Sequence, residues 1–307
     1  MRAFHFLILS FLVLATLSAQ IQDHFDPDFF HNLEFAHRGG YAYGPENTIE
    51  TIIYNLGNST QAIEVDVQLT KDHQLVLFHD ETVKRVLETS KNTKIHELTL
   101  EELQAIPLRG NEEESVFVPT LESMIDTLVT LVSNGEIRDF ILELDFKPHD
   151  DDQLKPAVSE LMRIIGSKEA EMGDQIYNYF FVSSFYPFVL REIRAQSSKI
   201  KTAFAVNSSP DRNKIKGKMG VLFAGMVIRK YDAQIIEPNI CIITQKFVKK
   251  WNKKGILING YTANTECKKE YLKTLNIAIT SNCPGSTCNP DKSDQIKKGN
   301  KWCKRCD

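Results

Sequence analysis

The sequence has no cysteine in its first 240 residues, and beyond its first 19 residues it has no apolar run long enough to span a bilayer. A membrane-spanning helix needs about 20 apolar residues, so we do not expect the body of the chain to cross a membrane. The formal net charge is only -3, which excludes a strong overall field, and we expect no nucleic-acid partner. No long stretch rich in Pro, Gly and Ser interrupts the chain, so nothing marks a linker between two domains.

The overall composition is that of a globular protein, with 42% hydrophobic and 25% charged residues among 307. The charge is unevenly placed, because residues 241–307 hold 14 Lys and Arg against 5 Asp and Glu. A solvated basic face is the ordinary explanation of such a segment, and attraction of an anionic substrate or lipid is the alternative. The composition therefore allows contact with a membrane surface but does not require it.

The N-terminus has the pattern of a secretory signal peptide. A positively charged start is followed by nearly continuous apolar residues from Phe6 to Ala15 and by small residues up to Ala19. We expect residues 1–19 to be removed, which predicts a secreted protein or one retained in the lumen of the secretory or lysosomal pathway. An uncleaved anchor is the alternative. Sequons at Asn58 and Asn207 are candidate glycosylation sites.

The cysteines agree with export. They are Cys241, Cys267, Cys283, Cys288, Cys303 and Cys306. An even number in an exported chain predicts disulfides, whose pairing the sequence alone does not decide. Zinc is the alternative, because Cys283 with Cys288 and Cys303 with Cys306 form two thiol pairs with near-ligand spacing. In an oxidising compartment we favour disulfides.

Hydrophobic periodicity predicts strands that alternate with helices. Residues 62–69 alternate apolar with polar side chains, which is the period of a strand. The next apolar run, 75–79, follows too soon for a parallel crossover, so the two strands should form an antiparallel hairpin arm. The other expected strands lie at residues 33–37, 140–146, 179–184, 202–206, 234–236, 255–261 and 277–281.

Without the arm, eight strands joined mostly by helices remain. Eight such units over about 250 residues predict an α/β protein with a closed (β/α)8 barrel, a TIM barrel. An open doubly wound sheet is the alternative. We expect the barrel to occupy residues 20–284 and a tail rich in Cys and Lys to follow at 285–307.

Polar residues gather at the carboxyl ends of the first predicted strands, where barrels build their active sites. They are His37 and Arg38 after the first strand, Glu64 and Asp66 on the second, His79 after the arm, and Glu143, Asp145 and Lys147 on the next strand. Inward carboxylates are costly unless they are paired or bind a cation, and Ca²⁺ and Mg²⁺ prefer oxygen ligands. The histidines suit acid/base catalysis, and the cationic side chains suit a phosphate.

Each of these residues also has an ordinary structural explanation. A single His at a strand end is usually structural, Glu64 and Asp66 could face solvent, and Lys147 could simply pair with Asp145. Taken together, they favour a metal-assisted phosphate site.

Several short motifs occur in a fixed order along the chain. They are Ala36-His37-Arg38-Gly39-Gly40, Pro45-Glu46-Asn47-Thr48, residues 64–72, Leu77-Phe78-His79-Asp80, residues 118–122 and Ser183-Ser184-Phe185. With these motifs the sequence resembles the glycerophosphodiester phosphodiesterase family over residues 33–284. The resemblance implies a (β/α)8 barrel with an insertion, here short and at about 81–118. It also implies hydrolysis of small glycerophosphodiester substrates to an alcohol and sn-glycerol 3-phosphate, with one divalent cation, Ca²⁺ or Mg²⁺.

The resemblance further implies roles for single residues. His37 and His79 would be the general acid and base, Glu64 and Asp66 would be cation ligands, and Arg38 would hold the phosphate.

Three departures from the family pattern bear on the site. Asp145-Phe146-Lys147 stands where Glu-x-Lys is usual, Tyr261-Thr262-Ala263-Asn264 replaces Trp-Thr-x-Asn, and Ser281-Asn282-Cys283-Pro284 replaces Thr-Asp-x-Pro. We expect Asp145, rather than Glu143, to be the third carboxylate at the cation. Lys147 would contact the phosphate, and Tyr261 would supply an aromatic wall for the glycerol or the headgroup.

Two other functions stay open. A phospholipase D-like enzyme of the same barrel class would act on lysophospholipid or sphingolipid, and an inactive barrel would only bind phosphodiesters. No catalytic group is missing from the chain, which favours an active enzyme. The headgroup is not determined by the sequence.

Overall fold

The computed structural model describes most of the chain. The described residues are 23–109, 115–148, 151–207 and 217–288. The predicted signal peptide, the last two cysteines and most of the predicted tail therefore lie outside the described residues.

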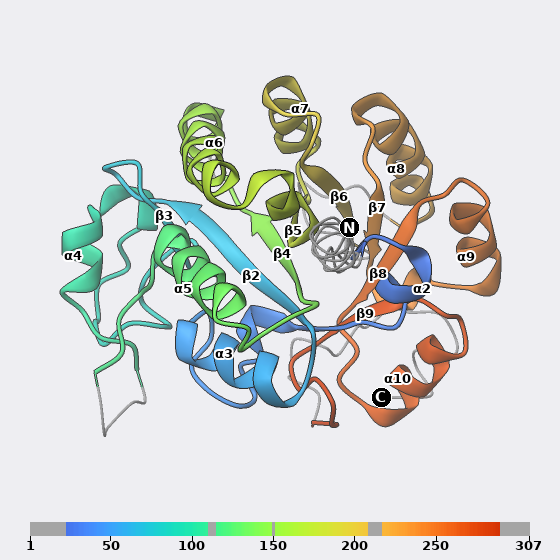
Figure 1. Cartoon of the computed structure of the whole chain (residues 1–307), viewed down its shortest axis with the longest axis horizontal. Helices are drawn as coiled ribbons and strands as arrows, with labels where there is room; N and C mark the ends of the chain where they lie inside the picture. The colour runs from blue at the N-terminus through green and yellow to red at the C-terminus, as the bar shows by residue number, and fades with distance from the viewer. Residues whose placement is uncertain (1–22, 110–114, 149–150, 208–216, 289–307) are drawn as a thin grey trace, which may run out of the picture.

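Eight parallel strands close into a barrel (Figure 1), as predicted, and the open sheet is excluded. In chain order they are β1 (Glu34–Ala36), β2 (Ala62–Leu69), β4 (Ile141–Phe146), β5 (Phe180–Ser184), β6 (Lys201–Val206), β7 (Ile235–Pro238), β8 (Leu257–Tyr261) and β9 (Ala278–Ser281). Closure occurs at β1, which pairs in parallel with both β2 and β9. The seam between β9 and β1 thus joins the two ends of the barrel segment.

The predicted arm is present as β3 (Leu75–Leu77), which pairs antiparallel with β2. The insertion that follows has a small hydrophobic cluster of its own, which packs on β3 and includes Leu87 and Leu103. It contains η2 (Ile95–Glu97) and α4 (Leu100–Gln104), which stands apart from the ring of barrel helices in Figure 1. Thr99 and Glu102 begin α4 with the capping box that their spacing predicts.

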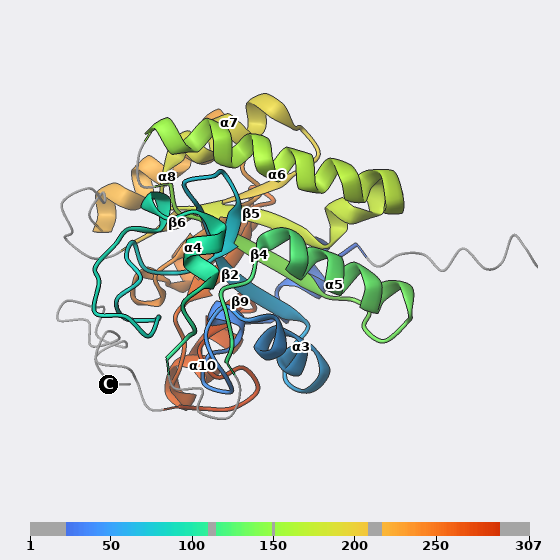
Figure 2. The same cartoon turned by 90° about the vertical axis from the view of Figure 1, so that its left-hand side faces the viewer.

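The other helices surround the barrel, and Figures 1 and 2 show them on the outside of the strands. They are α3 (Ile49–Asn58), α5 (Leu121–Ser133), α6 (Asp151–Met172), α7 (Pro187–Gln196), α8 (Gly217–Tyr231), α9 (Gln245–Asn252) and α10 (Glu266–Lys273), with α2 (Pro27–Phe30) before β1 and short turns η1 (His37–Gly39), η3 (Gly173–Asn178) and η4 (Ile240–Ile242). The sequence pattern did not predict α8 or α10. The helix α8 contains three glycines, and α10 is mostly charged, so neither shows a clear apolar stripe. No described helix combines the length and apolarity that a bilayer crossing needs.

The inside of the barrel changes from apolar to polar along its axis. One apolar residue from each of the eight parallel strands forms a layer at the amino ends of the strands, and Phe25 and Phe30 pack against it. Further along, the inward positions carry carboxylates and amides, while the outward positions pack against the helices. The alternation in β2 therefore has a specific cause, because both faces of this strand are buried and only its inner face is polar.

Candidate active site

Three carboxylates meet inside the barrel near the carboxyl ends of two neighbouring strands. Glu64 and Asp66 lie on β2 and Asp145 lies on β4, where Asp66 is in register with Asp145. One oxygen from each of the three lies within 4.8 Å of the other two, and all three side chains are buried. These are the residues that the sequence analysis expected to hold a cation.

The chemistry of the three carboxylates suits a divalent cation. Burial, and then the charge of Asp66, raises the pKa of Glu64 well above its ordinary value, and burial raises the pKa of Asp145. Asp145 Oδ1 is buried and accepts no hydrogen bond from any described residue. Buried oxygens that lack donors and repel one another are what a hard cation binds.

Lys147, at the end of β4, contacts two of these carboxylates. Its Nζ lies 2.5 Å from Asp66 Oδ1 and 3.3 Å from Asp145 Oδ2. Although burial alone would raise the pKa of Asp66, Lys147 and the neighbouring cationic groups lower it. Asp66 thus stays ionised beside two carboxyls that burial pushes toward the neutral form. In this geometry Lys147 is held at the carboxylates, and its predicted contact with phosphate would require the ammonium to turn.

The chain at the end of β1 turns sharply beside these carboxylates. Arg38, Gly39 and Gly40 all have positive φ, and a Cβ on Gly40 would meet the amide of Asn55 at 2.5 Å. This turn lets the backbone N–H of Arg38 donate to Glu64 Oε2 at 2.7 Å. The Arg38 side chain extends toward Glu46, at 3.4 Å, and Asp66, at 3.8 Å. The guanidinium therefore lies next to the site, where a phosphate would be attracted.

Asn47, in the segment between η1 and α3, holds Asp66 in place. Its amide donates to Asp66 Oδ2 at 2.9 Å, and its carbonyl accepts from the Asp66 backbone N–H at 3.1 Å. Asn47 has a positive φ and its N–H donates to the Arg38 carbonyl. The Pro-Glu-Asn-Thr motif contained this residue, but its role depends on a loop conformation that the sequence does not display.

His37 lies between an amide and the carboxylates. Its Nδ1 is 2.7 Å from Asn282 Oδ1, and its Nε2 is 3.9 Å from Glu64 Oε2. Burial, followed by the positive charge of Arg38, lowers the pKa of His37 to about 3. The imidazole is therefore neutral near pH 7, as a group that accepts a proton must be.

The Nδ1 atom of His79 has a carboxylate as its partner, where that of His37 has an amide. Its Nδ1 lies 2.6 Å from Asp80 Oδ1, and Arg85 donates to Asp80 Oδ2 at 2.6 Å. Arg85 comes from the insertion and also binds both oxygens of Glu46. The hydrogen bonds from His79 and Arg85 lower the pKa of Asp80 despite its partial burial. The two histidines thus differ in their Nδ1 partners, and the insertion supports only one of them.

A pair of carboxylates, Glu143 and Glu237, lies deeper in the barrel than the three of the site. Glu143 accepts from Ser183 Oγ and from Asn259 Nδ2, each at 2.9 Å, and hydrogen bonds to Glu237 of β7. Both acids are buried, and Asn259 Nδ2 also lies 3.3 Å from Glu237 Oε1. Glu143 therefore lies in the layer below the site and is hydrogen bonded there. The sequence pattern did not indicate Glu237, because a single Glu in a four-residue strand gives no periodic signal.

Tyr261, at the end of β8, closes another side of the site. Its hydroxyl donates to the Val206 carbonyl at 3.0 Å, and its ring meets Phe185 edge-on at 5.8 Å. Burial, and then the charges of Glu237 and Asp145, raises the pKa of Tyr261. The position suits the predicted aromatic wall.

Comparison with known proteins agrees with this geometry. The profile of the glycerophosphoryl diester phosphodiesterase family matches residues 37–285. The chain belongs to this family. It is thereby a phosphoric diester hydrolase by family, and the resemblance noted in the sequence is confirmed.

Relatives of this phosphodiesterase are found in animals and bacteria. Glycerophosphodiester phosphodiesterase 1 of Rattus norvegicus is 26% identical over 258 residues, which cover 78% of this chain and 74% of the rat protein. A glycerophosphodiester phosphodiesterase of Bacillus subtilis is 26% identical over 306 residues and covers 95% of this chain and 94% of its own.

Solved structures share the fold of this phosphodiesterase. An Oleispira antarctica phosphodiesterase, in complex with the product sn-glycerol-3-phosphate, has a TM-score of 0.67 at 20% identity and covers 84% of this chain and 95% of its own. A glycerophosphodiester phosphodiesterase from Parabacteroides distasonis has a TM-score of 0.64 at 17% identity, with coverages of 83% and 94%.

The deeper acid pair leads to a prediction about stability. Burial raises the pKa of Glu237 to about 8 from an ordinary value of 4.5. The stability that its protonated form contributes is therefore complete below about pH 4.5 and is lost as the pH rises through about 8. Gln at position 237 cannot ionise. The free energy of unfolding of Glu237→Gln minus that of the wild type should therefore increase between about pH 5 and pH 8. Urea unfolding in EDTA at both pH values measures this difference.

Glu88→Gln, at an exposed position in the insertion, is the matched control and should show no such trend. A stability difference between Glu237→Gln and the wild type that stays constant or shrinks with rising pH would contradict the prediction.

Proposed function

We propose that this phosphodiesterase hydrolyses small glycerophosphodiesters to an alcohol and sn-glycerol 3-phosphate, using one divalent cation and two histidines. The observation that carries the proposal is the buried set of Glu64, Asp66 and Asp145 with His37 beside it and Arg38 at its edge. The family match and the product in the Oleispira antarctica structure support the same substrate class.

The two histidines supply the proton transfers. One removes the proton from the attacking hydroxyl, which belongs to the substrate or to water, and the other protonates the leaving alkoxide. Each keeps Nδ1 on a fixed partner, Asn282 for His37 and Asp80 for His79, so each ring is oriented by that partner. Arg38 and Lys147 supply positive charge for the phosphate, and Tyr261 packs against the glycerol or the headgroup.

Glu64, Asp66 and Asp145 would hold the cation, Ca²⁺ or Mg²⁺. When bound, such an ion stabilises the negative charge that develops on phosphate oxygens. The protein's own contribution is to keep all three carboxylates in place, through Arg38 N–H on Glu64, Asn47 on Asp66 and Lys147 on Asp145.

The N-terminus and the cysteines bear on the compartment in which the protein acts. We infer a secreted protein or one in the lumen of the secretory or lysosomal pathway, which the signal-like segment supports. Cys283 and Cys288 form a disulfide in the structure, and Cys241 and Cys267 are disulfide-bonded as well, which suits an oxidising compartment. The zinc alternative therefore loses one of its two thiol pairs. Neither a nucleic acid nor a membrane is needed as a partner.

Release of choline and sn-glycerol 3-phosphate from glycerophosphocholine tests the function. We expect turnover that EDTA abolishes and that Ca²⁺ or Mg²⁺ restores, each ion being added back separately. Lysophosphatidylcholine serves as the comparison substrate. Faster turnover of lysophosphatidylcholine would favour the phospholipase D-like alternative, and no turnover of either substrate would favour a binding protein.

Loss of either histidine should remove most of the activity. His37→Ala and His79→Ala are each expected to reduce kcat by at least about 10²-fold, the usual contribution of a positioned proton transfer. Steady-state kinetics at saturating substrate and metal measures this effect. His73→Ala, a turn residue between β2 and β3, is the control and should keep normal turnover. Near-normal kcat in either active-site variant would rule out its acid/base role.

The two acids of β4 should differ in their effect on the metal requirement. Asp145→Asn removes a charge from the proposed ligand set, so the metal concentration for half-maximal rate should rise strongly and added metal should partly restore the rate. Glu143→Gln removes a charge from the deeper layer and should leave the metal curve close to that of the wild type. Rates measured against Ca²⁺ or Mg²⁺ concentration compare the two variants. A shifted curve for Glu143→Gln but not for Asp145→Asn would reverse the assignment.

A further inference from the structure

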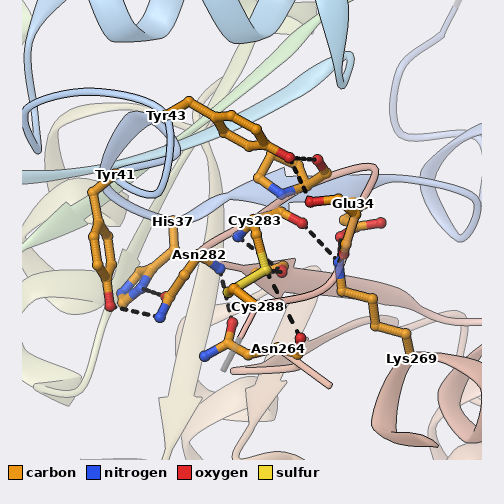
Figure 3. Close-up of a disulfide and its surroundings, with 12 residues drawn as sticks. Glu34, His37, Tyr41, Tyr43, Asn264, Lys269, Asn282, Cys283 and Cys288 are labelled. Carbon is orange, nitrogen blue, oxygen red and sulfur yellow. Dashed lines mark hydrogen bonds and ion pairs between the residues drawn. A yellow bond between two sulfur atoms is a disulfide. The ribbon is translucent and has the colours of Figure 1, made fainter. Parts of the chain in front are cut away.

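The last strand of the barrel is followed by a small disulfide-closed loop. Cys283 and Cys288 join five positions apart, directly after β9 (Figure 3). In the described part of the chain no helix follows β9, whereas helices follow the other parallel strands before the next one begins. The disulfide loop therefore stands where a barrel would otherwise use its last helix.

A buried lysine holds this loop against the barrel. Lys269 of α10 is only 3% exposed, and its Nζ donates to the carbonyls of Cys283, at 2.8 Å, and Ser286, and also binds Glu34 of β1. An ammonium so deeply buried is stable only when it is paired and hydrogen bonded. These contacts tie the loop to β1, the strand directly before His37, across the seam where the barrel closes.

Tyr43 adds a further anchor on the outer side. Its hydroxyl donates to the Pro284 carbonyl at 2.8 Å and lies 2.6 Å from Ser286 Oγ. Figure 3 shows the Tyr43 and Lys269 side chains reaching the loop from different elements. The loop is thus fixed by its own covalent bond, by α10 and by the turn that follows β1.

Asn282 lies between this loop and His37, and all its hydrogen-bonding groups in the structure are used. Its backbone N–H donates to Asn264 Oδ1 at 2.9 Å, and its carbonyl accepts from the Ala42 N–H at 3.2 Å. Its side-chain amide donates to Tyr41 Oη at 2.5 Å, which leaves Oδ1 facing His37 Nδ1 at 2.7 Å. The parallel pairing of β1 with β9 explains why Asn282 lies beside His37. Ala36 is in register with Ser281, so the residues that follow them, His37 and Asn282, are neighbours.

The loop and Asn282 share a support. Asn264, which accepts the Asn282 N–H with its side chain, accepts the Cys288 N–H at 3.1 Å with its backbone carbonyl. Asn264 thus contacts both Asn282, directly before the loop, and Cys288, at the end of the loop. If the disulfide is absent, only the peptide chain and the noncovalent contacts of the loop hold Cys288 against the barrel, and the position of Asn282 loses one of its constraints.

We propose that Asn282 is a positioning residue for His37 and that the Cys283–Cys288 loop holds Asn282 in place. By accepting a hydrogen bond from Nδ1–H, the Asn282 amide oxygen fixes the tautomer in which Nε2 carries a lone pair and faces the Glu64 side of the site. This proposal rests on the proposed function, in which His37 transfers a proton. It goes beyond that function because it assigns a role in turnover to a disulfide that is not among the proposed acid/base, phosphate-binding or cation-binding residues.

The kinetic test separates positioning from binding. Asn282→Ala is expected to lower kcat by about 10²-fold, since small misplacements of catalytic groups cost about that much, while KM for glycerophosphocholine stays close to the wild-type value. Asn282→Asp keeps an acceptor at the same place and should recover most of the lost kcat. The double variant Cys283→Ser with Cys288→Ser should lower kcat about tenfold, again with little change in KM.

Ser286→Ala is the matched control within the loop. It removes only the side-chain contact to Tyr43 and keeps the carbonyl that Lys269 binds, so its kcat should equal that of the wild type. Asn282→Ala retains the disulfide, so the proposal stays testable even if the double cysteine variant fails to fold. Unchanged kcat in Asn282→Ala, or no recovery in Asn282→Asp, overturns the role of Asn282. Unchanged kcat in a folded double cysteine variant overturns the role of the loop.

A spectroscopic measurement decides the tautomer without any activity. In protein labelled with ¹⁵N at its histidine rings, His37, assigned through His37→Ala, should show a protonated Nδ1 and an unprotonated Nε2 in the wild type and in Asn282→Asp. That preference should be lost in Asn282→Ala. A wild-type His37 protonated at Nε2 overturns the proposal even if the enzyme is active. A protein without glycerophosphodiester turnover that shows the expected tautomer would instead contradict only the proposed function.

Discussion

Mutual repulsion among buried carboxylates is the constraint on which the rest of this structure depends. Five acids face the inside of the closed barrel, and their side chains are all nearly inaccessible to water. They are Glu64, Asp66, Glu143, Asp145 and Glu237. Lys147 and Arg38 offset part of this charge, burial moves other acids toward the neutral form, and a divalent cation would offset the remainder. The same burial that lowers the stability of the barrel therefore produces a group of carboxylates that could hold a cation.

The surrounding structure can be understood as the means of keeping those acids in place. The apolar layer at the amino ends of the strands, covered by Phe25 and Phe30, excludes water from below. Amides and hydroxyls rather than further cations hold the deeper pair, as Asn259 and Ser183 do for Glu143. Neutral donors of this kind fix geometry without cancelling the charge that a cation must find. The positive groups are kept at the mouth, where the phosphate would enter.

Much of this arrangement could be predicted from the sequence, because β2 and β4 are long enough to show their alternation and because barrel strands place their ends together. The trio of Glu64, Asp66 and Asp145 follows from those two facts. Single polar residues on short strands or in loops gave no such signal, and Glu237 was missed for that reason. The helices α8 and α10 were missed because their composition hides the apolar stripe, and tertiary packing rather than local pattern stabilises them.

The two histidines differ in how far along the chain their Nδ1 partners lie, and this difference involves the seam where the barrel closes. His79 belongs to the arm, and its Nδ1 partner Asp80 is held by Arg85, so its support comes from the insertion beside it in the chain. His37 takes its partner from the opposite end of the barrel segment, 245 positions away. Local sequence can hold the first histidine, but only closure of the barrel can hold the second. A disulfide loop directly after Asn282 therefore lies at the place where the proposed proton transfer by His37 would depend on the two ends of the barrel meeting.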